Sequence, residues 1–232
     1  RDSNDLVFKL QGAEKVRINS SGAVGIGTTA NLQGSLTVFN GDNFSTATNN
    51  SSDNIYLISD ATSGDGVYGA SISFSRVQYP DRKGAAIVSV QKGSDEDNVG
   101  LAFFTHPSAT ATDPLVEAMR IDASGNVGIG ASSAGGKLEI HQEQVTGQFD
   151  RDCFLRLHPS AHTNSGGFTN MMFGTSTTNN YGVAIGGLRA GTDNAPSFRI
   201  NMLNDSVSGF NALTIDPTGA VTMPLQPAFS VT

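Results

Sequence analysis

The sequence has little of several residue types on which other architectures depend. It has no Trp and one Cys, Cys153, among 232 residues. A single Cys cannot form an intrachain disulfide, so packing must stabilise the folded state, and we expect Cys153 to be a buried, unreactive thiol. No apolar run approaches the roughly 18 residues that a membrane-spanning helix needs, so we expect no membrane insertion.

Positive charge is also scarce. The chain has 14 Lys and Arg against 21 Asp and Glu, which gives a net charge of −7, and charged residues are only 15% of the total. Nucleic-acid binding needs a basic surface that attracts phosphates, so this balance argues against a nucleic-acid partner. We interpret the acidity as a contribution to solubility.

Helical periodicity is missing as well. No stretch repeats apolar residues every 3.6 positions, so we expect almost no helix. The apolar residues, 38% of the chain, occur in short alternating runs, and 27 Gly residues together with many Ser, Thr and Asn separate these runs. Short alternating runs bounded by such turn residues predict an all-β fold with antiparallel sandwich-like bodies.

One stretch, residues 119–130, predicts a tight β-hairpin. Ile121 ends one alternating run and Val127 begins the next. Asp122 stands where its side chain can accept hydrogen bonds from the backbone N–H groups ahead of it, and Gly125 stands where the turn requires a positive φ. This spacing is typical of a type I turn followed by a left-handed residue.

The second strand of this hairpin has one bare side. Val127 and Ile129 alternate with Gly128 and Gly130, so one face is branched and apolar and the other has no side chains. A bare strand face predicts that another backbone or another subunit approaches closely.

The pattern occurs three times, in residues 16–27, 119–130 and 213–224. The copies are about 100 residues apart, which is too long for a solenoid or propeller period. The expected turn residues are Asn19, Gly22, Asp122, Gly125, Asp216 and Gly219. The residues that we expect to be packed or at an interface are Ile18, Val24, Ile26, Ile121, Val127, Ile129, Ile215 and Val221.

The repeats suggest a domain plan of two tandem β-sandwich-like units of about 100 residues, joined by glycine-turn β-hairpins. The chain starts inside what reads as a repeat, so we expect a fragment of a longer protein. We predict that residues 1–30 are the closing strand and hairpin of a truncated preceding unit. Two complete units follow, at 31–131 and 132–224, and each ends in a hairpin. Residues 225–232 are expected to be a junction to the next segment.

The phrase Arg-Ile-Asp-x-x-Gly-x-Val-Gly-Ile-Gly, present at 120–130 and nearly so at 17–27, resembles a recurring signature of bacteriophage tail-fibre and other fibrous virion proteins. Residues 221–229 also resemble a junction segment common in those proteins. The resemblance implies a homotrimer about a long axis, located on the virion and associated with other fibre or tail proteins. The residues alone indicate only that copies pack on the Val/Ile face, which would fix strand register and cover exposed edges.

Further strands are expected in parallel positions of the two units. Residues 6–10, 99–104 and 198–202 precede the three hairpins, and 34–39 and 136–140 follow the first two. The remaining body strands are expected at 55–58, 70–76, 84–90, 153–157, 168–173 and 182–188.

No constellation of residues indicates catalysis, a cofactor or a metal. The glycines of the hairpins have the wrong order for a phosphate-binding loop, and no helix is expected after them. His158 and His162 lie in a loop context without a third ligand, and Asp95, Glu96 and Asp97 lack the spacing of a calcium loop. Asp150 and Asp152 flank Arg151 and favour a local ion pair over a pair of glycosidase carboxylates.

We therefore expect a non-catalytic structural segment of a phage fibre that supports host-surface attachment. Host contact, if it occurs, is expected in the loops 40–53, 60–70, 92–98, 105–114 and 160–167. The alternatives are a receptor-recognition module that binds a host glycan, a polysaccharide depolymerase spike, and a bacterial surface adhesin.

Overall fold

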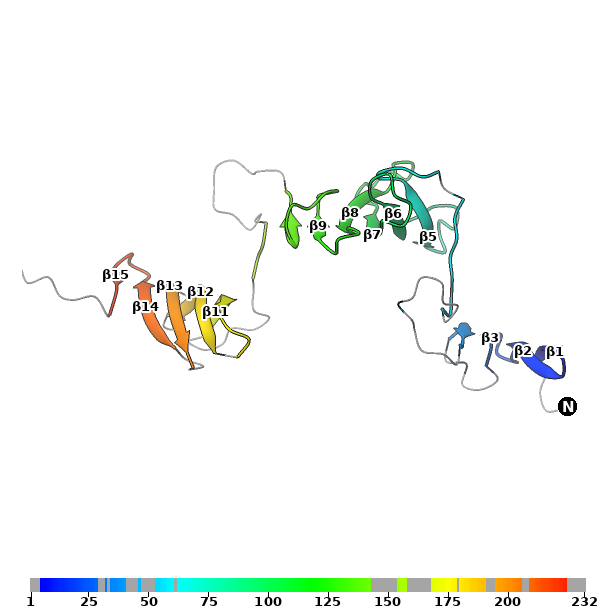
Figure 1. Cartoon of the computed structure of the whole chain (residues 1–232), viewed down its shortest axis with the longest axis horizontal. Coiled ribbons are helices and arrows are strands. Elements are labelled where there is room, and N and C mark those ends of the chain that lie inside the picture. The colour runs from blue at the N-terminus through cyan, green and yellow to red at the C-terminus, as the bar shows by residue number, and fades with distance from the viewer. Residues whose placement is uncertain are drawn as a thin grey trace, which may run out of the picture. The chain divides into compact units, whose positions relative to one another are not determined.

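The computed structural model describes residues 5–28, 32, 34–40, 46, 53–60, 62–142, 154–157, 168–178, 180–190, 195–205 and 209–224. The chain divides into two compact units, residues 1–142 and 143–232. The strands form three sheets, which Figure 1 shows along the chain. No helix occurs among the described residues, and so none there is long and apolar enough to cross a membrane. The predicted all-β class is confirmed.

The first sheet has four strands in sequence order: β1 (Leu6–Leu10), β2 (Ala13–Ile18), β3 (Val24–Ile26) and β4 (Leu36–Val38). β1, β2 and β3 are antiparallel neighbours, whereas β4 runs parallel to β3. Gln11 and Gly12 join β1 to β2 with φ values of 52° and 80°. Two consecutive positive φ values are what a two-residue hairpin loop needs to match the twist of its strands.

The second sheet has six strands: β5 (Tyr68–Phe74), β6 (Ala85–Gln91), β7 (Val99–Thr105), β8 (Val116–Ile121), β9 (Val127–Ile129) and β10 (Leu138–Ile140). Neighbours are antiparallel except for β9 and β10, which are parallel. The third sheet is antiparallel throughout: β11 (Phe168–Gly174), β12 (Tyr181–Ala190), β13 (Ala195–Asn204), β14 (Phe210–Ile215) and β15 (Val221–Thr222).

The parallel strands differ from the expected arrangement. β4 and β10 were expected to start the antiparallel body of the following unit, but they hydrogen-bond to the preceding hairpin. Val24 lies opposite Leu36, and Val127 lies opposite Leu138. The domain boundaries predicted at 30/31 and 131/132 separate β4 and β10 from the sheets to which they hydrogen-bond, and assign both strands to the following unit.

A β-bulge recurs in front of each hairpin. Lys15, Ala118 and Ala212 are the extra residues, because the pairing register shifts by one at each of these positions. Residues three apart on a regular strand lie on opposite faces. The bulge adds one residue, so Glu117 and Arg120 point to the same face.

Each sheet is a single layer among the described residues, and no second sheet packs on it there as in a sandwich. Among the described strands, contacts run only between hydrogen-bonded neighbours. The buried apolar side chains of the described residues are small, and Val90 is the largest that is fully buried. The others are Ala86, Val88, Ala102, Ala131 and Ala184. One layer cannot enclose a core of large side chains because each sheet needs a second layer on its apolar face.

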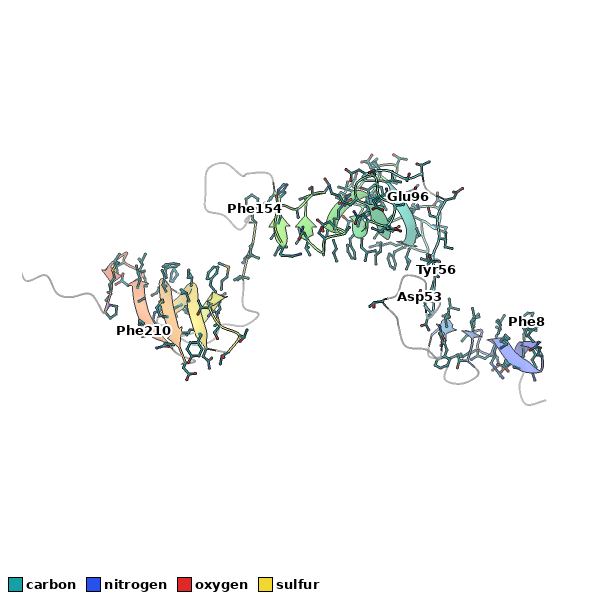
Figure 2. The ribbon with its side chains drawn as sticks, in the orientation of Figure 1. Phe8, Asp53, Tyr56, Glu96, Phe154 and Phe210 are labelled. Carbon is teal, nitrogen blue, oxygen red and sulfur yellow. The ribbon has the colours of Figure 1, made fainter. Side chains whose placement is uncertain are left out.

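Two predicted strands do not form. Residues 55–58 are not part of any strand, and neither are residues 154–157, although both segments are apolar. Tyr56 is 75% exposed and Phe154 is 51% exposed, and both are labelled in Figure 2. Alternation and β-propensity are present in both segments, but propensity alone does not make a strand, because it expresses fit to a neighbouring strand and surface.

Candidate functional site

The hairpin after β8 is closed by one carboxylate. Asp122 Oδ1 accepts hydrogen bonds from the backbone N–H groups of Ser124 and Asn126, both at 2.9 Å. The backbone N–H of Gly125 donates to Asp122 O at 2.9 Å, and φ of Gly125 is 74°. The N–H groups of Asn126, chiefly, and Ser124 hold the pKa of the Asp122 carboxyl below its usual value. An Asx turn therefore occupies the position where the sequence pattern predicted one.

The other two copies of the hairpin have the same geometry. Asn19 Oδ1 accepts from the N–H groups of Ser21 and Ala23 at 3.1 and 2.9 Å. Asp216 Oδ1 accepts from Thr218 and Ala220 at 2.8 and 2.9 Å. The closing glycines, Gly22 and Gly219, have φ values of 84° and 88°. An amide oxygen thus replaces the carboxylate in the first copy without loss of the turn.

The bare strand face is covered by the chain's own crossover. Gly128 is buried, and a Cβ on it would clash with the carbonyl oxygen of Ala131 in the loop that leads from β9 to β10. Gly25 is also buried, and a Cβ added to it would lie only 2.7 Å from Leu32 Cδ2 in the loop between β3 and β4. Glycine therefore lets the chain fold back and add a parallel strand.

A buried ion pair lies beside this crossover. Arg120 is 7% exposed, and its Nε and Nη2 donate to Glu117 Oε1 and Oε2 at 2.8 and 2.7 Å. The Tyr68 hydroxyl, from β5, donates to Glu117 Oε2 at 2.7 Å. Burial opposes ionisation of Glu117, but the hydrogen bonds from Arg120 and Tyr68 outweigh it and keep its pKa below the usual value. Burial and the bond to Glu117 raise the pKa of Tyr68.

The first copy repeats this pair with a different third partner. Arg17 Nε and Nη2 donate to the Glu14 carboxylate at 2.6 and 2.7 Å, and Arg17 Nη1 donates to Asp5 Oδ2. The bonds to Glu14 and then Asp5 raise the pKa of Arg17. Asp5 therefore takes the place that Tyr68 has in the second sheet. The sequence signal for this pair is Glu-x-x-Arg in front of the hairpin. It predicts an ion pair only if a bulge between the two residues brings both side chains to the same face.

The third copy moves the arginine to the neighbouring strand. Thr214 stands where the other copies have Arg, and Asn211 stands where they have Glu. Arg199 lies opposite Thr214 across the β13–β14 ladder, on the same face. The cross-strand partner of Arg120 in the second sheet is Ala102. Each copy therefore has an arginine on this face of its sheet. It lies on the strand before the turn in the first two copies, and on the neighbouring strand β13 in the third.

The opposite face of each sheet is apolar and uncovered. Cross-strand pairing and alternation place the large apolar residues of the second sheet on one face. Ile72, Leu101 and Ile129 there are 50%, 45% and 40% exposed. The residues of this apolar face are Ile72, Phe74, Ile87, Leu101, Phe103, Met119, Ile121, Val127, Ile129, Leu138 and Ile140.

The first and third sheets present the same kind of face. Phe8 on the first sheet is 55% exposed and Phe210 on the third is 45% exposed, and Figure 2 labels both. The sequence-predicted interface residues all lie on these faces, as the pairs Ile18–Val24, Val16–Ile26, Ile121–Val127, Met119–Ile129 and Ile215–Val221 show. Ile26 and Val221 are exposed, and Ile18 and Ile121 are partly exposed.

The remaining candidate positions do not assemble into a reactive centre. Asp95, Glu96 and Asp97 form the turn between β6 and β7, where Asp95 Oδ1 accepts from the Asp97 N–H at 3.0 Å. No group of three or more His, Cys, Asp or Glu side chains gathers as a metal site in the described part of the chain. Asp150, Asp152, Cys153, His158 and His162, the junction 225–232 and the loop 160–167 lie outside the described residues.

Comparison with known proteins gave matches to solved structures alone. No family model matches the sequence, and no curated protein matches it. The carboxy-terminal domain of the bacteriophage T5 L-shaped tail fibre, solved with its intramolecular chaperone domain, aligns with a TM-score of 0.37 and 10% identity over 82% of this chain. The alignment spans 64% of that chain, which is less than two thirds of its length. A second structure of the same carboxy-terminal domain aligns with a TM-score of 0.35 and 9% identity, over 82% of this chain and 93% of that chain.

Proposed function

We propose that this chain is a structural segment of a phage fibre, in which three copies pack their apolar faces around a common axis. The observation that carries the proposal is the uncovered apolar face, which recurs on all three sheets. Monomeric proteins rarely leave a contiguous apolar patch of more than a few hundred Å² in water. A six-stranded sheet with large side chains such as Phe74 and Leu101 half exposed needs a second layer.

Copies of the same chain are the layer that fits best. The three sheets of one chain carry the same kind of face, so identical chains laid in parallel would cover every face at once. The number three rests on the resemblance of the hairpin phrase to phage fibre proteins.

The hairpins act as joints in this proposal. The turn at Asp122–Gly125 reverses the chain, and the crossover past Gly128 adds a parallel strand that leads toward the next sheet. Backbone hydrogen bonds fix each turn, and a Glu–Arg ion pair adds to this in the first two copies. A spacer of this kind supports host attachment and performs no catalysis.

Mass spectrometry of purified virus particles tests the proposed location. We expect peptides of this chain in the particles and none in the surface fraction of uninfected host cells. Detection in uninfected cells would favour a bacterial adhesin and contradict the proposal. A reducing-sugar assay on host capsule is expected to show no product, and release of oligosaccharide would identify a depolymerase.

A further inference from the structure

A hollow of about 450 Å³ lies at one end of the second sheet. The turn between β5 and β6 forms one wall, and the loop between β7 and β8 forms the other, because both connections leave the sheet at the same end. Its polar lining consists of Ser75, Arg76, Tyr79, Arg82, Lys83, His106 and Ser108. The hollow lies beyond the strand ends and is separate from the apolar face.

The lining is cationic in a chain that is otherwise acidic. Arg76, Arg82 and Lys83 are three of the chain's 14 Lys and Arg, whereas the net charge of the whole is −7. None of the three forms an ion pair within the described residues. Asp81 is the one acid in the same turn, and the Asp113 carboxylate on the opposite loop accepts a hydrogen bond from Ser108 Oγ at 2.6 Å. The hollow therefore keeps an excess of positive charge.

The turn that holds these cations is fixed by hydrogen bonds. Ser75 Oγ lies 2.6 Å from the carbonyl oxygen of Tyr79 and 2.5 Å from that of Arg82. The Tyr79 N–H donates to Arg76 O at 2.9 Å, and the Gly84 N–H donates to Phe74 O at 2.7 Å. A mobile loop loses conformational entropy when it binds a ligand. These hydrogen bonds already order the β5–β6 turn, so this entropy cost of binding would be smaller.

Tyr79 gives the hollow an aromatic wall. The Arg82 guanidinium lies over the Tyr79 ring, 4.8 Å from its centroid, which holds both side chains in place. Tyr79 remains 52% exposed, so part of its ring is accessible. An accessible ring beside guanidinium groups matches a ligand with an apolar C–H face and an anionic group.

We propose that this hollow binds an anionic saccharide, whose carboxylate or phosphate contacts Arg76, Arg82 and Lys83 while the sugar ring packs on Tyr79. The proposal goes beyond the structural role, because a spacer does not need a cationic hollow. Arg presents a fork of donors that matches both carboxylate and phosphate oxygens. The overall charge of −7 disfavours a nucleic acid as the source of the phosphate.

Isothermal titration calorimetry on the 232-residue chain tests this site with four probes. We expect glucuronic acid and glucose 6-phosphate to bind with Kd values on the order of 1 mM, and glucose to show no saturable binding. Binding of one of the two charged sugars alone would identify the anionic group and support the proposal in that form. Inorganic phosphate that binds as tightly as glucose 6-phosphate would overturn the saccharide assignment.

Three substitutions locate the binding. Arg82→Gln is expected to weaken binding about tenfold, since it removes one of the proposed ion pairs and its contact with Tyr79. Lys83→Gln tests the same hollow without changing the Arg82–Tyr79 stack. Lys92→Gln is the matched control, because Lys92 lies in the turn at the opposite end of the sheet and loses the same charge. Absence of binding to both charged sugars, or an equal loss in Lys92→Gln, would overturn the proposal.

Discussion

The second and third hairpins share a turn but differ in the strand that follows it. Asp122 and Asp216 accept equivalent backbone hydrogen bonds, and both turns close with a glycine at positive φ. After the turn, Gly128 and Gly130 in the second hairpin correspond to Thr222 and Pro224 in the third. The turn is thus set by the Asx residue and the closing glycine, and it does not depend on the glycines of the following strand.

The glycines of the following strand have a separate role. In the second hairpin the Gly130 N–H donates to Ala118 O at 3.0 Å, and the chain then crosses over Gly128 to form β10. Pro224 has no N–H to donate at the equivalent position, and Thr222 has the Cβ that would block such a crossover. β15 contains two residues, where β9 contains three. Gly128 and Gly130 therefore permit the parallel return of the second hairpin, and this role is separate from that of the closing glycine of the turn.

The largest expected effect is a loss of assembly when the apolar face, which both hairpins share, is disrupted. We expect Ile121→Asp and Ile215→Asp each to prevent assembly, because each buries a charge in the proposed interface between copies. Light scattering measures the outcome as a fall to a single-chain mass or as loss of soluble protein. Ser73→Asp is the control, since Ser73 lies on the other face of the same sheet. An unchanged mass for both isoleucine variants would contradict the proposed interface.

The second prediction is a loss of stability in the second hairpin that the third hairpin should not show. Gly128→Val is expected to destabilise the protein by about 3 kcal/mol or more, because the side chain would collide with the Ala131 backbone. Thr222→Val at the equivalent position should change the melting temperature little, because that position already carries a branched side chain and is exposed. Thermal unfolding followed by circular dichroism measures both. Equal losses would show that the crossover does not depend on glycine.

The third effect should be the same in both hairpins. Gly125→Val and Gly219→Val each place a β-branched residue at positive φ, which costs roughly 1–2 kcal/mol, although no atom beyond the two adjacent residues lies within 4 Å of either added Cβ. We expect Gly125→Val to lower assembly yield and thermal stability far more than Asn126→Ala, whose side chain makes one 3.2 Å bond to Asp122 Oδ2. Similar values for Gly125→Val and Asn126→Ala would contradict the turn assignment.

The smallest effect concerns pH and the Glu117–Arg120 ion pair of the second copy, for which the third copy has Asn211 and Thr214. The folded pKa of Glu117 is below its usual value, so its stabilisation is present above the unfolded pKa, near 4.3, and is lost as pH falls through the folded value. Glu117→Gln should therefore flatten the decline in stability below about pH 4.3. Urea unfolding at several pH values measures this, with Glu96→Gln in the exposed β6–β7 turn as the control. An unchanged acid response would refute the role of Glu117.

Local chemistry made the turns predictable. Asp122 and Gly125, like their equivalents in the other copies, lie within four residues of one another, so a local sequence pattern is enough to predict the turn. The strands next to the turns follow from alternation, as for residues 6–10. The bulges at Lys15, Ala118 and Ala212 were missed, because an extra residue changes the register without leaving a composition signal. The Glu117–Arg120 pair was missed for the same reason.

Tertiary context explains the remaining differences. Residues 55–58 carry β-propensity but belong to no strand among the described residues, since propensity expresses fit to a neighbouring surface more than a backbone preference. The sandwich was expected because apolar alternation implies a covered face, and alternation does not reveal whether the cover comes from the same chain. The cationic hollow joins residues 75–84 and 106–111, and this proximity follows from the order β5 to β8 in the sheet.

The mass of the chain in solution tests the proposed assembly most directly. Light scattering during size-exclusion chromatography, repeated over a dilution series, should give about three times the 24.1 kDa chain mass at every concentration at which the protein is folded. A folded species of 24.1 kDa that unfolds cooperatively on its own would show that the apolar faces do not need other copies, and would contradict the proposal.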